Sequence, residues 1–316
     1  MKAFITGING FAGSYLAEAL LKSGRQVAGS VQPGTPLDNL AAIETQLKLI
    51  PLDLNDSSAL EKILAAEAPD EIYHLAAVSS VKDSLDDPRQ CFIVNVLGSL
   101  NLLEAVRHHL PKTTVVLVTS SEIYGEALSD KVLTSESSPI IPKSPYAVSK
   151  AALDQLGRVY AKTYGLRVVM ARPFSHTGPR QTPTFFVPTV AKQIAELEKS
   201  GGGEIKVGNL EIYRDFTDVR DVVDAYILLA EKGKSGEAYI ICRGENQYLK
   251  KIVARLTELV KVPIKVTVDP DRFRKADLIS MKIDNRKLKD LGWMPRRPLD
   301  ATLVEILQFW REKVAQ

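Results

Sequence analysis

The stretch KAFITGINGFAG, residues 2–13, decides the fold of this chain. Its first half, Lys2–Thr6, is a short apolar run that predicts a buried strand. Gly7, Gly10 and Gly13 follow at intervals of three, and the amphipathic run SYLAEALLKSG predicts a helix directly after them. Glycines permit a tight turn and a close approach of the backbone, and a helix N-terminus presents N–H groups to an anion. The order strand, glycine turn, helix therefore predicts a dinucleotide site, with a ligand-free glycine turn as the alternative.

Apolar strands and helical stretches alternate through the first half of the chain. The predicted strands are Gln26–Ser30, Leu47–Leu52, Glu71–Ala76, Thr114–Thr119 and Arg167–Ala171, and the predicted helices are Ser57–Ala68, Pro88–His109 and Tyr146–Tyr164. This alternation is typical of a parallel sheet with helices on both faces. We therefore predict an α/β fold, with a Rossmann-type doubly wound parallel sheet over residues 1–172. A smaller C-terminal α/β lobe follows over 173–316, and elements near 210–243 return to the first domain.

The composition is that of a globular protein, with 45% hydrophobic and 25% charged residues. The net charge of +3 comes from scattered residues, which argues against a nucleic-acid partner. Cys91 and Cys242 lie in apolar runs and are expected to be buried thiols. Two cysteines and no signal sequence indicate the cytoplasm, and no apolar run approaches the ~20 residues that a membrane span needs. The four histidines are dispersed, so we expect no metal site.

Tyr146 and Lys150, in the run SPYAVSK, stand four residues apart. A helix places residues at this spacing on one face. A free phenol has a pKa of about 10, and a lysine ammonium beside it favours the phenolate. We therefore predict that Lys150 lowers the pKa of Tyr146, which could then give or take a proton near neutral pH. Two solvated residues on a helix face are the alternative.

The chain resembles an extended short-chain dehydrogenase/reductase of the nucleotide-sugar type over essentially its whole length. The resemblance rests on the glycine turn, Asp53-Leu54, HLAA at 74–77, Asn95, TSSEIYG at 119–125, Tyr146 with Lys150, RPFSHTGPRQ at 172–181, RDFTDVRD at 214–221 and LGWMP at 291–295. Within that family, HLAAVSSVKDS and IKVGNLEIYRDFTDVRDVVDAY most resemble the GDP-4-keto-6-deoxy-mannose reductases, which make GDP-D-rhamnose. GDP-mannose 4,6-dehydratases are related, and epimerases usually carry Ala where Glu122 stands.

This resemblance implies NAD(P)H-dependent reduction of the C4 ketone of a GDP-4-keto-6-deoxy-hexose. Tyr146 would supply the proton, Lys150 would assist it and bond the nicotinamide ribose, and Ser120 would hydrogen-bond the same sugar oxygen. Glu122 would be catalytic only in a dehydratase, as the base that removes the C5 proton. A dehydratase, an epimerase, and a dinucleotide-binding sensor or scaffold without activity remain the alternatives.

The resemblance also implies a set of cofactor contacts. They are Gly7, Gly10, Phe11, Gly13, Asp53, Leu54, Leu75, Ala76, Ala77, Asn95, Tyr146 and Lys150. Asn95 has an equally weighted alternative, which is local structural duty in its helix. Neither an acid nor an arginine stands in Ser30-Val31-Gln32 after the second strand. We therefore expect NADP(H) to be favoured and NAD(H) to be possible.

A substrate diphosphate suits basic side chains, and the resemblance places the nucleotide sugar in the second lobe. The expected substrate contacts are Ser121, Ser175, Arg180, Lys192, Arg214, Arg274 and Asp277. Ser175 stands where the family usually has Asn, and Asp277 lies in a departure from the usual R-P-x-E-V. The resemblance further implies a homodimer, formed through the two long helices at about 88–109 and 146–164.

Overall fold

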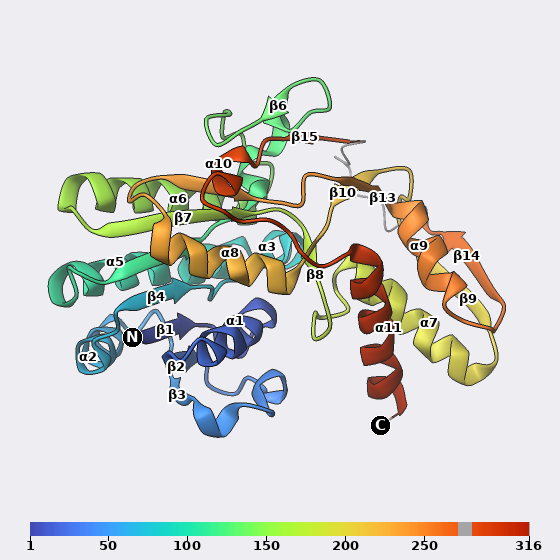
Figure 1. The fold of residues 1–316 in the computed structure, drawn as a ribbon, viewed down its shortest axis with the longest axis horizontal. Helices are drawn as coiled ribbons and strands as arrows, with labels where there is room; N and C mark the ends of the chain where they lie inside the picture. Colours follow the sequence, from blue (N-terminus) through green and yellow to red (C-terminus); the bar gives the residue numbers. More distant parts are fainter. Residues whose placement is uncertain (271–279, 316) are drawn as a thin grey trace.

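The computed structural model describes residues 1–270 and 280–315 of the chain. Its centre is a sheet of seven parallel strands in the order β12-β7-β5-β4-β1-β2-β3 (Figure 1). These strands are β1 (Lys2–Thr6), β2 (Gln26–Val31), β3 (Lys48–Pro51), β4 (Glu71–His74), β5 (Thr114–Val118), β7 (Arg167–Pro173) and β12 (Ala238–Ile241). The strand order reverses at β1, and β1 and β4 meet there. The predicted Rossmann-type sheet is thereby confirmed, and ligands in such sheets bind where the order reverses.

Helices cover both faces of this sheet. On one face, α1 (Phe11–Lys22) packs beside α8 (Val219–Lys232) in a shared apolar cluster. On the other face lie α2 (Ser57–Glu67), α5 (Gly98–His109) and α6 (Pro145–Tyr164). The central strands are buried on both faces, which explains why their sequences read as continuous apolar runs rather than alternating ones.

The predicted helix Pro88–His109 is interrupted in the structure. It consists of α4 (Pro88–Phe92), a π-helical stretch η3 (Ile93–Leu97) and α5. Within it, the Ser99 hydroxyl donates a 2.5 Å hydrogen bond to the Asn95 carbonyl oxygen. Such bonds from a hydroxyl to the preceding turn distort helices, and no apolar periodicity in the sequence reports them.

The second lobe has its own apolar core. It is built from α7 (Phe186–Ser200), β9 (Gly203–Val207), α9 (Leu249–Glu258), β14 (Ile264–Val268) and α11 (Leu299–Ala315). β9 and β14 pair in parallel as a separate two-stranded sheet. Figure 1 shows this lobe standing beside the carboxyl ends of the large sheet, with α7 and α11 side by side.

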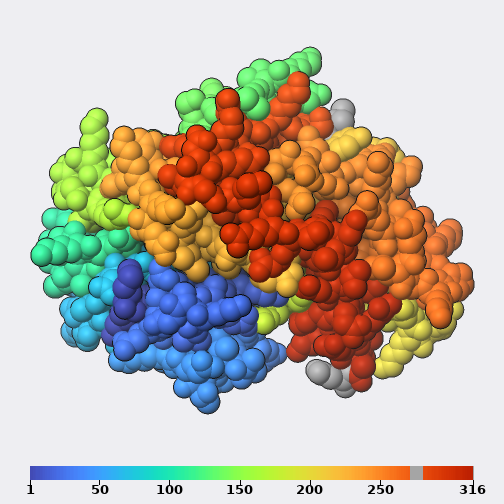
Figure 2. Space-filling view, in the orientation of Figure 1, coloured from blue at the N-terminus to red at the C-terminus, as the bar shows by residue number. Residues whose placement is uncertain are grey.

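Short elements complete the structure. They are η1 (Asp38–Leu40), η2 (Glu44–Gln46), α3 (Val81–Asp86), η4 (Ser121–Ala127), β6 (Leu133–Thr134), β8 (His176–Thr177), β10 (Tyr213–Asp215), β11 (Thr217–Asp218), β13 (Asn246–Tyr248), β15 (Lys282–Ile283) and α10 (Arg286–Lys289). β8 pairs with β11, β10 with β13, and β6 with β15. In Figure 2 the C-terminal part of the chain, in red, runs down the middle of the visible face between the blue and the orange elements.

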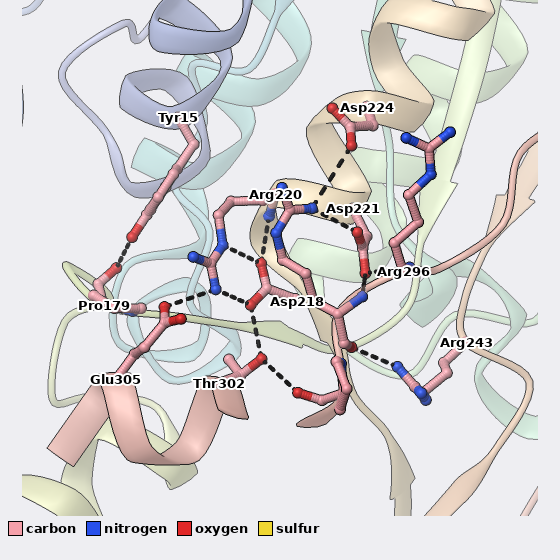
Figure 3. A network of polar contacts seen from close by, with 12 residues as sticks. Tyr15, Pro179, Asp218, Arg220, Asp221, Asp224, Arg243, Arg296, Thr302 and Glu305 are labelled. Carbon is pink, nitrogen blue, oxygen red and sulfur yellow. Dashed lines mark hydrogen bonds and ion pairs between the residues drawn. The ribbon is translucent and has the colours of Figure 1, made fainter. Parts of the chain in front are cut away.

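Buried aspartates of the RDFTDVRD motif join the two lobes (Figure 3). Asp218 caps the N-terminus of α8, holds the Arg220 guanidinium, and accepts a 2.7 Å hydrogen bond from the Thr302 hydroxyl of α11. One turn later, Asp221 accepts 3.0 Å hydrogen bonds from the backbone N–H groups of residues 296 and 297. The motif thus fixes α8 of the large sheet against the start of α11.

Asp215 makes the third of these connections. Its carboxylate accepts hydrogen bonds from the backbone N–H groups of residues 243–245, at 2.6–2.8 Å. Burial nevertheless raises the pKa of Asp215 to about 6, against the opposing effect of those N–H groups. The segment that follows β12 is therefore held against β10 by one buried carboxyl group.

Candidate active site

A cleft of about 860 Å³ lies along the carboxyl ends of the sheet strands and reaches the inner wall of the second lobe. Its lining contains most of the residues that the sequence singled out. They are Gly7, Gly10, Phe11, Gly13, Asp53, Leu54, Leu75, Ala76, Ala77, Ser120, Ser121, Glu122, Tyr146, Lys150, Ser175 and Arg214. One concave surface therefore joins the predicted cofactor, catalytic and substrate regions.

The glycine turn forms the start of this cleft. Gly7 has φ +69°, and a Cβ on it would stand 3.0 Å from the Ala76 Cα. A Cβ on Gly13 would stand 2.3 Å from the Gly7 carbonyl oxygen, a distance that no side chain tolerates. Within the part of the chain that the structure describes, no side chain caps the N-terminus of α1, so its first N–H groups line the cleft without a side-chain acceptor. These features fit the pyrophosphate of a dinucleotide.

Neutral polar residues line the cleft beyond β2. Asn9 donates a 2.9 Å hydrogen bond to the Thr35 hydroxyl, and both residues lie in the lining with Gln32. Asp53 is turned toward its own loop, where it accepts from the Asn55 backbone and side chain at 2.9 Å. Among the described residues, no lysine or arginine contributes to the lining at this end.

The catalytic pair lies on the first two turns of α6. Ser144 caps this helix through the Ala147 N–H, and Pro145 occupies its first turn, so the start of the helix is fixed by its sequence. The Lys150 ammonium donates a 2.8 Å hydrogen bond to the Val118 carbonyl oxygen at the end of β5. Tyr146 and Lys150 are both buried, so the solvated-face alternative does not apply.

Burial dominates the electrostatics of this pair. It raises the pKa of Tyr146 to about 12, and the Ser120 side chain acts in the opposite direction. Burial also lowers the pKa of Lys150 to about 8. The predicted lowering of the Tyr146 pKa is therefore wrong for this chain, because burial raises that pKa instead. Tyr146 is a neutral phenol at pH 7 and can act as a proton donor.

Ser120 and Glu122 project from the turn that follows β5. The Ser120 hydroxyl caps η4 by accepting a 3.1 Å hydrogen bond from the Glu122 N–H. Glu122 itself is exposed, lines the cleft and lies near enough to Tyr146 for its charge to raise the tyrosine pKa. A serine, a tyrosine and a carboxyl group therefore face the same part of the cleft.

Three predicted binding residues lie outside the cleft lining. Arg180 forms a 2.6 Å ion pair with Glu18 of α1, and its guanidinium lies 4.4 Å from the Tyr15 ring centroid. Lys192 forms an ion pair with Glu196, four residues along α7. Both side chains face carboxylates of their own chain.

Asn95 is the third of these residues. It is buried, its amide exchanges hydrogen bonds of 2.8 Å and 3.1 Å with the Val78 backbone, and it donates to the Ser149 hydroxyl. This is the structural alternative: Asn95 holds the segment that follows Ala76 and Ala77 against α6. The expected substrate contacts Arg274 and Asp277 lie outside the described residues.

Other lining residues were not among the predicted site residues. The second-lobe wall is largely apolar, and its members include Phe186, Val190, Val207, Ile212 and Leu249. Their sequence positions match the helical or strand core pattern, so periodicity alone does not separate a cleft wall from a core. Tyr226 of α8 also reaches the lining, from a helix face that is otherwise aliphatic.

Within residues 1–270 and 280–315, no helix is long and apolar enough to cross a lipid bilayer. Over the same residues, no three His, Cys, Asp or Glu side chains come together as a metal site would need. Cys91 and Cys242 are both buried and unbridged.

Comparison with known proteins shows the family of this chain. The family model for GDP-mannose 4,6 dehydratase matches residues 4–306. The chain belongs to that family. It is 31% identical to the GDP-6-deoxy-D-mannose reductase of Pseudomonas aeruginosa, over 100% of this chain and 99% of that protein. It is 30% identical to the GDP-mannose 4,6-dehydratase of Vibrio cholerae, over 96% of this chain and 92% of that protein.

A solved structure agrees with this assignment. RMD from Pseudomonas aeruginosa, complexed with NADPH, has a TM-score of 0.83 and 30% identity to this chain and covers 99% of both. The predicted membership of the extended short-chain dehydrogenases/reductases is confirmed. The chain is an enzyme of this oxidoreductase and dehydratase class.

Proposed function

We propose that this protein reduces the C4 ketone of a GDP-4-keto-6-deoxy-hexose with NADPH, giving a GDP-6-deoxy-hexose of the GDP-D-rhamnose type. The observation that carries the proposal is the end-to-end match to the Pseudomonas aeruginosa reductase. The neutral Tyr146 phenol in the cleft lining supports it, because a reductase needs a proton donor beside the substrate carbonyl.

The residues of the chain divide the work as follows. NADPH, when bound, supplies a hydride to the sugar carbon. Tyr146 supplies the proton to the oxygen of the same carbonyl group, so one C=O bond becomes CH–OH. Ser120 faces the same region from the end of β5 and is suited to hold that oxygen in line. Lys150, anchored on the Val118 carbonyl, places a positive charge beneath the reacting centre.

The far end of the cleft is suited to the nucleotide. Arg214 lines it and can donate to a diphosphate, while the apolar wall around Val190 and Leu249 can cover a base. We propose the homodimer as well, through α4–α5 and α6. These helices expose large apolar side chains, among them Phe92, Leu97, Val148 and Val159.

The direct test measures how many NADPH molecules are oxidised for each sugar molecule that is converted. A reductase consumes one NADPH for each 4-keto sugar that it converts. We expect stoichiometric oxidation of NADPH with GDP-4-keto-6-deoxy-mannose, and a kcat/KM with NADH that does not exceed the NADPH value. A preference for NADH above about tenfold, or some 1.4 kcal/mol, would contradict the cofactor assignment.

Glu122 keeps a 4,6-dehydratase as the second candidate. It lies exposed in the cleft two residues after Ser120, where a base could remove the C5 proton. For a reductase, Glu122→Gln should reduce kcat less than about tenfold, because no C5 proton is removed. Conversion of GDP-mannose to the 4-keto sugar without added reductant, abolished by Glu122→Gln, would establish the dehydratase.

A cofactor-binding sensor without activity is also distinguished by these assays. It would bind NADPH and oxidise none with any keto sugar. The presence of Ser120, Tyr146 and Lys150 together in one cleft speaks against that function.

A further inference from the structure

Tyr226 is the unexplained polar group of the cleft. It lies on α8, on the buried helix face that also carries Val219, Val222 and Val223, and its side chain is 0% exposed. Its hydroxyl has no hydrogen-bond partner among the described residues. Burying a hydroxyl without a partner is unfavourable, and native proteins seldom leave one so.

The hydroxyl belongs to the cleft rather than to the core. Tyr226 contributes to the cleft lining, and the Tyr146 phenol is close enough to affect its titration. The two tyrosines come from opposite faces of the sheet, because α6 packs in one apolar cluster and α8 in the other. They therefore approach each other at the carboxyl ends of the strands, where the catalytic centre lies.

The position of Tyr226 indicates which group of a bound cofactor its hydroxyl would contact. The hydride and the Tyr146 proton reach the two ends of one C=O bond, so the nicotinamide ring must lie within a few ångströms of Tyr146. α8 packs against α1, which begins at the glycine turn, so Tyr226 approaches from the cofactor side. The carboxamide is the one neutral polar group on that ring, and a neutral hydroxyl in apolar surroundings suits an amide rather than a phosphate.

We propose that the Tyr226 hydroxyl accepts a hydrogen bond from the N–H of the nicotinamide carboxamide and so fixes which face of the ring meets the substrate. This inference rests on the proposed function, since it needs a nicotinamide cofactor in the cleft. It adds a cofactor contact from α8, on the face of the sheet opposite the Tyr146 helix.

Cofactor binding without sugar tests this contact. Dissociation constants of NADPH and of 2′-phospho-ADP-ribose, which lacks the nicotinamide ring, are measured by calorimetry for the wild type and for Tyr226→Phe. We expect Tyr226→Phe to weaken NADPH binding by roughly three- to tenfold, the size of one neutral hydrogen bond, and to leave the truncated ligand unchanged. Equal effects on both ligands, or no effect on NADPH, would overturn the proposal.

Thermal unfolding of the free protein gives an independent readout. Because the hydroxyl has no partner in residues 1–270 and 280–315, Tyr226→Phe should leave the Tm of the free chain unchanged or raise it, and should reduce the further rise that NADPH causes. The matched control is Tyr239→Phe on β12. The Tyr239 hydroxyl accepts a 3.0 Å hydrogen bond from the Lys234 N–H outside the cleft lining, so its loss should lower the free Tm and spare NADPH binding. A fall in the free Tm of Tyr226→Phe equal to that of the control would show a structural role instead.

A cofactor analogue adds a measurement whose wild-type arm does not depend on the folding of the variant. The 3-acetylpyridine analogue of NADP⁺ replaces the carboxamide by a methyl ketone, which cannot donate. Tyr226→Phe should change the ratio of the NADP⁺ and analogue dissociation constants from its wild-type value. Equal binding of NADP⁺ and the analogue by the wild type would contradict this contact. Failure of the wild type to bind either ligand would instead contradict the proposed function.

Discussion

The two ends of the cleft are built in different ways. At the sheet end, backbone geometry makes the site: glycines without room for a Cβ, an uncapped helix start, and side chains anchored on strand carbonyls. At the second-lobe end, side chains from helices and short strands make an apolar wall with few charges. Sites of the first kind follow from local sequence, whereas sites of the second kind depend on which distant side chains happen to meet. The contrast can be tested by substitution at each end.

The largest effect should come from Tyr146→Phe at the sheet end. The variant keeps the ring and removes the proton donor, so kcat should fall by roughly 10² or more. NADPH affinity, measured by fluorescence titration, should stay within about twofold because the packing of the ring is retained. Reduction at the wild-type rate would show that another group supplies the proton.

At the second-lobe end, Arg214 and Lys192 make a matched pair of basic residues. Arg214 lines the cleft, whereas Lys192 is held by Glu196 outside the lining. Arg214→Ala should raise the KM for the sugar nucleotide about tenfold or more, the size of one charged hydrogen bond, while Lys192→Ala should change it less than about twofold. Equal KM values for the two variants would contradict the role of Arg214 in binding the sugar nucleotide.

The pH dependence reports on Lys150. Burial lowers its pKa to about 8, so the ammonium is present below pH 8 and is lost as the pH rises through that value. If the charged form is required, kcat/KM for reduction should be level below pH 8 and fall about tenfold for each unit above it. Lys150→Arg keeps its charge and should move the fall to higher pH. A wild-type profile that stays level to pH 10 would contradict the assignment.

Arg180→Ala should give the smallest change in activity. Its ion pair with Glu18 and its contact with the Tyr15 ring are partly buried, so a loss of about 1–2 kcal/mol of stability is expected. The KM for the sugar nucleotide should change less than about twofold, because the side chain is outside the cleft lining. A large rise in KM with an unchanged Tm would reverse this interpretation.

The sequence predicted the sheet end well for physical reasons. The glycine turn, each apolar strand and the polar residues after Val118 are short runs of consecutive residues that can be recognised in the sequence. A parallel sheet then brings the carboxyl ends of its strands to one edge. Strand boundaries differ from the predictions by a few residues at most, as at β4. The spacing of Tyr146 and Lys150 and the motifs around them predicted the pair, but the pKa values of the two side chains depend on burial, which the spacing does not give.

Other predicted site residues were less predictable, because their partners in the fold are far away in sequence. Arg180 meets Glu18 across the fold, and nothing in the GPRQ motif indicates that carboxylate. The Asn95 amide is satisfied by Val78 and Ser149, which is equally invisible before folding. Tyr226 was not predicted as a site residue because it occupies a core position of a regular helix. Only the lack of a hydrogen-bond partner for its hydroxyl among the described residues distinguishes it from a core tyrosine.

The place of β12 in the sheet has a consequence for synthesis. β12 forms the edge beside β7, yet α7 and β9 of the second lobe lie between these two strands in the sequence. A nascent chain that has reached only residue 172 therefore presents the apolar β7 as an unpaired edge, the kind of strand that joins other molecules. Part of the second lobe is therefore synthesised before the last strand of the large sheet, and a chain cut near residue 172 would lack β12.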